Sequence, residues 1–154
     1  MKTWIIFLTT IFMFIGLSAC SQSTEKMQDG YYTAESVGFD AYGWKPFITI
    51  YVSSNKLTTI EYNAKDASGF IKSWDVDWMR KMKAQVGTYP NKYSRAYAED
   101  LLNKQDPSKV NPIPGTASSY DWFKLLAEAA IKQSKSGDKK VAFVDLPDIM
   151  SEKE

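Results

Sequence analysis

The chain has 154 residues, with 19 basic and 18 acidic side chains, one cysteine and no histidine. This composition excludes a zinc site of the His/Cys type, a Ser-His-Asp triad and a Cys-His pair, so no metal site and no catalytic residue are predicted. A net charge of +1 provides no basic surface for nucleic acid, which is therefore not an expected partner. Five tryptophans among many aromatic residues supply either a core or a stacking surface.

The first residues have the layout of a bacterial lipoprotein signal. Lys2 precedes an apolar run from Trp4 to Gly16, and Leu17-Ser18-Ala19 then leads to Cys20. The apolar run is too short for an ordinary membrane span, and small residues before a cleavage point are typical of a segment that is removed during export. The pattern predicts a signal peptide over residues 1–19.

Cys20 is the predicted site of lipid attachment. It is the single cysteine, so it has no intrachain partner for a disulfide, and it directly follows the small-residue turn. Acyl chains such as palmitate on this thiol would hold the protein at the extracytoplasmic face of the cell membrane, with residues 20–28 as a lipidated tether. A plain signal peptide or an N-terminal anchor, with an incidental cysteine, is the alternative.

The predicted domain covers residues 29–146 and begins with strands. Residues 31–36 form a short strand candidate, and a loop is expected over 38–43. The segments 47–52 and 57–62 are rich in β-branched and aromatic residues and flank Ser-Ser-Asn, which predicts an antiparallel hairpin.

Three helices are expected after the hairpin. The first runs from Ser73 to Gly87, with Asp75 and Asp77 in its first turn, where carboxylates favour the positive end of the helix dipole. Its expected buried face contains four residues at steps of four, namely Trp74, Trp78, Met82 and Val86.

The second helix is expected from Ser94 until just before Pro107, and the third from Tyr120 to Lys135. A last strand is expected over 141–145, followed by a flexible tail over 147–154. The fold class that follows is α+β: a small single domain with an antiparallel, hairpin-based sheet packed against three helices.

The entry of the third helix is rich in hydroxyl groups. Thr116, Ser118 and Ser119 lie where the first turn leaves backbone amides unpaired and where the helix dipole is positive, which is the outline of an anion site. The alternative is a helix cap in which Ser118 and Asp121 form a shortened capping box. The local pattern is compatible with both.

The same loop resembles the signature of a known family. Gly115-Thr116-Ala117-Ser118-Ser119, followed by the helix around residues 123–130, is similar to the motif Ser-Gly-Ala-Thr-x-Ser/Thr of FMN-binding domain lipoproteins. Earlier in the chain, residues 29–32 resemble the opening strand of that family, residues 48–62 resemble its hairpin and residues 69–73 resemble its central segment.

This resemblance implies FMN as the cofactor, bound by Gly115, Thr116, Ala117, Ser118 and Ser119. In that family the threonine that matches Thr116 receives FMN through a phosphoester bond, which a separate flavin transferase forms from FAD. The motif departs from the family pattern because Ile113, Pro114 and Gly115 stand where the family has Ser, Gly and Ala. Covalent FMN at Thr116 is therefore one expectation, and noncovalent FMN or no flavin are the alternatives.

Several aromatic residues are candidates to flank the flavin ring or, alternatively, to fill the core: Tyr42, Trp44, Trp74, Tyr120 and Trp122. Among them, Trp44 lies in a glycine-flanked stretch and is expected to be displayed on a loop. Lys72 precedes a predicted helix and is expected either to pair with a phosphate or to remain solvated.

Two functions from different classes follow. The first is an anchored FMN-binding lipoprotein that transfers electrons between redox partner proteins or small electron acceptors, with the cofactor carrying the redox chemistry. The second is a cofactor-free surface lipoprotein that binds a partner or a small ligand through an aromatic patch.

Overall fold

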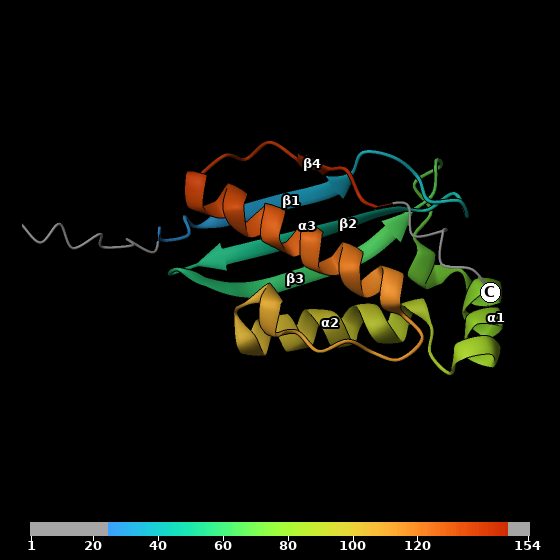
Figure 1. Ribbon diagram of the computed structural model, residues 1–154. Coiled ribbons are helices and arrows are strands. Elements are labelled where there is room, and N and C mark those ends of the chain that lie inside the picture. The colour runs from blue at the N-terminus through green and yellow to red at the C-terminus, as the bar shows by residue number, and fades with distance from the viewer. Residues whose placement is uncertain (1–24, 148–154) are drawn as a thin grey trace, which may run out of the picture.

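The computed structural model describes residues 25–147, so Cys20 and the predicted signal peptide lie outside the described residues. Its centre is one four-stranded sheet with the order β3-β2-β1-β4 (Figure 1). The β1–β2 and β2–β3 pairs are antiparallel, whereas β4 runs parallel to β1. The strands are β1 (Gly30–Ser36), β2 (Lys45–Ser53), β3 (Lys56–Lys65) and β4 (Ala142–Val144).

Two helices pack against this sheet: α3 contacts β1 and β2, and α2 contacts β3. Figure 1 shows α1 at the end of the sheet towards which β1 runs. The α+β class predicted from the sequence is thereby confirmed. The helices are η1 (Lys72–Trp74), α1 (Val76–Val86), α2 (Pro90–Lys104), η2 (Pro107–Lys109) and α3 (Ala117–Ser136). Among the described helices, none is long and apolar enough to cross a membrane.

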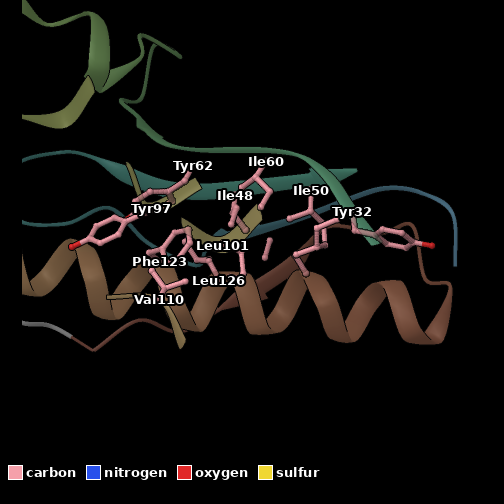
Figure 2. Packing of buried hydrophobic residues seen from close by; sticks show 14 of the residues in the cluster. Tyr32, Ile48, Ile50, Ile60, Tyr62, Tyr97, Leu101, Val110, Phe123 and Leu126 are labelled. Carbon is pink, nitrogen blue, oxygen red and sulfur yellow. The ribbon is translucent and has the colours of Figure 1, made fainter. Parts of the chain in front are cut away.

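The core lies between the sheet and the α2 and α3 helices (Figure 2). Burial alternates strictly along β2, as the two-residue period of a strand requires, so that Ile48 and Ile50 face the helices. Phe123 and Leu126 meet them from α3, and all four side chains are fully buried. This packing fixes the position of α3 across the sheet.

The β3 strand departs from simple alternation. Leu57 and Ile60 are both buried although they are three residues apart. The pairing with β2 shifts at this point, because Tyr51 faces Thr59 whereas Val52 faces Leu57. Such a bulge inserts one extra residue and returns both apolar side chains to the core face.

The predicted start and buried face of the first helix are wrong. Asp75 is the N-cap of α1, and its side chain accepts a hydrogen bond from Trp78 N at 2.9 Å, so the helix begins at Val76 and a separate turn, η1, precedes it. No residue of α1 is buried, and Trp74, before the helix, is 65% exposed. Of the four residues at steps of four, Met82 packs against the core, whereas Trp74 and Val86 are exposed.

The other helices begin earlier than predicted. The α2 helix starts at Pro90 rather than Ser94, since proline fits the first helical position, where no amide is needed. The α3 helix starts at Ala117 rather than Tyr120, so the hydroxyl-rich segment belongs to its first turn and not to the preceding loop.

Candidate functional site

A cavity of about 380 Å³ lies at the end of the sheet where β1 finishes. It is enclosed by the segment after β1, by η1 and α1, by the first turn of α3 and by the segment that follows β4. Six of the predicted site residues border this cavity together: Lys72, Gly115, Thr116, Ala117, Ser118 and Ser119. The structure thus brings a lysine from the middle of the chain to the start of α3.

The first turn of α3 presents free backbone donors to the cavity. Thr116 is the N-cap, and its carbonyl oxygen accepts the first helical hydrogen bond, from Tyr120 N at 2.8 Å. In the described part of the chain, no acceptor meets the amides of residues 117–119. The predicted cap by Ser118 is not formed, because the N-cap lies two residues earlier and no side chain caps the turn.

The Thr116 side chain itself points into the protein. Its residue is 3% exposed, and Thr116 Oγ1 donates to Ile113 O at 2.7 Å. Thr116 Oγ1 is also 2.5 Å from the hydroxyl of Tyr97, which accepts a hydrogen bond from Ile113 N at 3.2 Å. Because the hydroxyl proton of Thr116 is already donated to Ile113 O, the Tyr97 hydroxyl is the donor to Thr116 Oγ1. The two hydroxyl groups together hold the loop in place.

Gly115 is required by the shape of this loop. Its φ angle is +80°, and a Cβ atom at this position would lie 2.7 Å from Val86 Cβ. Both the backbone conformation and the close approach of α1 therefore exclude a side chain.

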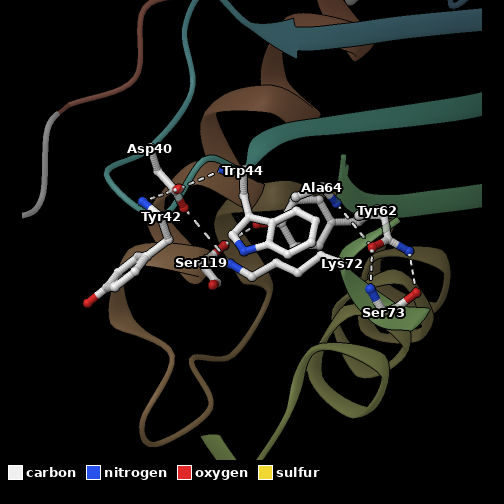
Figure 3. Close-up of polar contacts among 9 residues, drawn as sticks. Asp40, Tyr42, Trp44, Tyr62, Ala64, Lys72, Ser73 and Ser119 are labelled. Carbon is white, nitrogen blue, oxygen red and sulfur yellow. Dashed lines mark hydrogen bonds and ion pairs between the residues drawn. The ribbon is translucent and has the colours of Figure 1, made fainter. Parts of the chain in front are cut away.

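Lys72 is buried beside the cavity rather than solvated (Figure 3). Its residue is 8% exposed, and Lys72 Nζ lies 3.9 Å from Asp40 Oδ2, beyond hydrogen-bond distance. Nζ makes no hydrogen bond within the described residues, and burial lowers the pKa of Lys72, an effect that the Asp40 carboxylate partly offsets. An anion in the cavity would restore the solvation that this ammonium group has lost.

Two local devices hold Lys72 in place. On η1, Ser73 Oγ accepts a hydrogen bond from Asn63 Nδ2 at 2.8 Å, which fastens the turn to β3. In the segment after β1, Asp40 Oδ1 accepts from Tyr42 N and Trp44 N at 2.9 and 2.8 Å, which closes a turn around the carboxylate. The sequence analysis missed Asp40, although Asp followed by Tyr-Gly at this spacing is typical of such a turn.

The expectation that Trp44 is displayed on a loop is wrong. This side chain is 6% exposed and does not border the cavity. Its ring instead lies 5.6 Å from Lys72 Nζ, so that it backs the lysine with its π face. The glycine beside it supplies the bend of the turn and does not bring the indole to the surface.

Other aromatic residues form the walls. Tyr42, Trp78 and Trp122 border the cavity, and the rings of Tyr42 and Trp78 meet edge to face at 5.0 Å. Of the remaining candidates, Tyr120 donates its hydroxyl to Val110 O, and Trp74 is exposed elsewhere. The sequence indicated Tyr42 and Trp122 but gave Trp78 a role in the core.

Two tyrosines support the cavity from below. Tyr62 donates its hydroxyl to Ser119 O at 2.8 Å and thereby fixes the first turn of α3. Tyr93 borders the cavity, and burial raises its pKa to about 12, so it remains a neutral hydroxyl over the physiological range. Within residues 25–147, no group of three or more potential metal ligands is assembled.

These features define a small α+β domain with a cavity, at one end of its sheet, that combines a buried ammonium group, free helix amides and aromatic walls. The chain is 33% identical to the 15 kDa lipoprotein of Treponema pallidum (strain Nichols) over 123 residues, which are 80% of this chain and 86% of that protein. The chain therefore belongs to the family of this bacterial lipoprotein. The predicted lipoprotein character is confirmed at this level, and FMN binding stays a prediction.

A solved structure shares the fold. The crystal structure of the CPE2226 protein from Clostridium perfringens matches with a TM-score of 0.75 and 33% identity, covering 79% of this chain and 99% of that one. No family model matches the chain.

Proposed function

We propose that this protein is an extracytoplasmic lipoprotein, anchored through Cys20, that binds FMN in the cavity and acts as an electron-transfer flavoprotein. The observation that carries the proposal is the convergence of the buried Lys72 ammonium group and the free amides of the α3 first turn on one cavity. Within residues 25–147 neither group has an acceptor, and both favour a negatively charged group.

The lining of the cavity fits the two chemical parts of FMN. Lys72 and the amides of residues 117–119 would hold the phosphate, and Tyr42, Trp78 and Trp122 would hold the apolar ring. A volume of about 380 Å³ lies within the range of small-molecule sites. When bound, FMN supplies the redox chemistry, for which this chain needs no histidine of its own.

The test compares FMN with riboflavin, which has the same ring and no phosphate. We expect the full chain, purified in detergent, to quench the fluorescence of FMN and to bind it more tightly than riboflavin. Lys72→Met should lower the affinity for FMN by about ten- to hundredfold and remove the preference, since a hydrogen bond to a charged group is lost.

Lys81→Met is the matched control, because Lys81 is an exposed lysine on α1 outside the cavity lining. It removes the same charge and should leave both affinities unchanged. Absence of flavin binding at micromolar protein, or equal binding of FMN and riboflavin by the wild type, would contradict the proposed role of the cavity.

The second candidate is a cofactor-free surface lipoprotein that binds a partner or small ligand. Phe70 and Trp74 favour it, because they are 42% and 65% exposed and pack edge to face at 6.3 Å outside the cavity. If this candidate is correct, the wild type binds no flavin in the cavity. Trp74→Ala should then abolish binding of the partner.

A further inference from the structure

The hydroxyl of Thr116 is not presented as a nucleophile. It donates to Ile113 O at 2.7 Å and accepts from the Tyr97 hydroxyl at 2.5 Å. Both partners are internal, and the residue is 3% exposed. To react, the hydroxyl would have to leave these two hydrogen bonds and rotate out of the core, which would leave the buried Tyr97 hydroxyl without an acceptor.

The backbone also fixes how the loop matches the motif Ser-Gly-Ala-Thr-x-Ser/Thr. Gly115 has a φ angle of +80°, and a Cβ atom added to it would lie only 2.7 Å from Val86 Cβ. Alanine therefore does not fit at this position. Gly115 therefore corresponds to the glycine of the motif and not to its alanine. In this register Thr116 takes the place of the alanine and Ala117 that of the threonine, while Ser119 matches the final hydroxyl.

We infer that this lipoprotein holds its phosphate-bearing ligand without a covalent bond, because Ala117 stands where the acceptor hydroxyl would have to be. Ala117 is exposed and borders the cavity, so the position is accessible but carries only a methyl group. This inference rests on the proposed FMN site and deepens it: the ligand is exchangeable, a flavin transferase is not a partner, and Thr116 is a positioning residue.

The chemistry makes the inference testable. Attachment would join a side-chain oxygen to the phosphorus of the FMN half of FAD, break the pyrophosphate P–O bond, release AMP and pass the hydroxyl proton to solvent. Each event adds one FMN unit, less one water, to the intact mass. A methyl group has no oxygen that can enter this exchange.

The experiment incubates the full chain with FAD, Mg²⁺ and a flavin transferase whose activity has been verified on an acceptor that carries the complete motif. Intact mass is then measured under denaturing conditions. We expect no gain for the wild type and a gain of one FMN unit for the double variant Pro114→Ser, Ala117→Thr, mapped to residue 117 in a proteolytic peptide. Ala117→Ser with Pro114→Ser is the second variant, with a smaller side chain.

A gain by the wild type that disappears in Thr116→Val would overturn the inference. Failure of both double variants to gain mass would overturn the assignment of position 117. The alternative register predicts instead that Ile113→Ser, Pro114→Gly, Gly115→Ala gains FMN, and that result would likewise refute the argument from Gly115.

Equilibrium titration of the untreated wild type with FMN separates this inference from the proposed function. No binding in that titration refutes the FMN site, whatever the masses show. Binding that is fully reversed by dialysis, together with an unchanged mass, supports both.

Discussion

The Lys72 side chain carries a charge that is buried beside the cavity. Its ammonium group lies 5.6 and 5.2 Å from the ring centres of Trp44 and Trp78 and 3.9 Å from Asp40 Oδ2. It has thus lost water without gaining a hydrogen bond, and its pKa falls below the ordinary 10.5. Such an arrangement costs folding free energy, and the proposed anionic ligand would recover that cost on binding.

This gives a prediction for the pH dependence of stability. Because the pKa of Lys72 is lower in the folded than in the unfolded chain, the unfolded chain binds more protons between the two values, and the free energy of unfolding gains a positive slope with pH there. Lys72→Met removes that contribution. Denaturant unfolding from pH 7 to 10, in buffers without phosphate, should show the free energy of wild type relative to Lys72→Met rising with pH.

The matched control is again Lys81→Met, which removes an exposed lysine of the same charge from α1. Tyr93 remains in both variants, so ionisation of this buried phenol cancels in the comparison. A difference between wild type and Lys72→Met that is constant or falls with pH would contradict the buried state of the lysine.

For the individual residues of the site, the sequence indicated which residue types take part but not how their side chains are oriented. Lys72 and Ser118 were named from position alone, and both border the cavity. The inward turn of the Thr116 hydroxyl depends on Tyr97, which is 19 residues away in the chain and belongs to another helix. No local pattern contains that contact.

Among the elements, the loop before α3 and the end of α1 depend on each other. Val86 is the last residue of α1, and its side chain and carbonyl oxygen approach Gly115 so closely that they define the space for the loop. The α1 helix buries no residue of its own. Its contribution is therefore mainly to form a wall of the cavity and to support the loop, with the half-buried Met82 as its contact with the core.

Gly115→Ala should destabilise the fold by about 1–3 kcal/mol, because alanine is strained at this φ angle and its Cβ would lie 2.7 Å from Val86 Cβ. Val86→Ala should cost less, since Val86 is 42% exposed. Alanine keeps the Cβ atom of residue 86 and removes only its two γ-methyl groups, so the double variant should recover the part of the loss that comes from Val86 Cγ2, which would lie 3.2 Å from the new Cβ atom. Thermal unfolding of the four proteins measures this coupling, and strict additivity would show that the two residues do not touch.

The helix boundaries show why elements were found but misplaced. Asp75 was assigned to a first turn because carboxylates are favourable there, yet the same side chain serves as the N-cap, and the helix begins at Val76 rather than at Ser73. The hairpin was predicted correctly as an antiparallel pair. Its bulge was not, because the shift at Val52 is set by which side chains the helices bury.

For the whole molecule, the α+β class and a domain with one hydrophobic core could be predicted from the hydrophobic pattern and the length, which are global properties of the sequence. The parallel pairing of β4 with β1 did not follow, because a three-residue strand carries too little pattern to indicate its partner. The cavity likewise arises from segments that are distant in the chain, so its shape was beyond sequence reasoning.

Attachment to the membrane is a prediction at this scale, and Cys20 lies outside the described residues. Cys20→Ala should leave the precursor unprocessed or release the protein from membranes, because the thiol that receives the acyl chains is lost. Detergent phase partitioning and intact mass measure this. Ser21→Ala is the control and should partition as the wild type does; unchanged partitioning of Cys20→Ala would refute lipid attachment at this residue.

The route of β1 separates the cavity from the end of the domain where the chain enters. The strand starts at Gly30 and reaches the cavity at Ser36, so the opening lies about 20 Å further along the sheet than the point where the chain enters (Figure 1). The ten residues from Cys20 to Gly30 extend at most about 35 Å. This reach exceeds the distance between the chain entry and the cavity, so a lipid on Cys20 would leave the cavity accessible both to a water-soluble partner and to a partner in the bilayer.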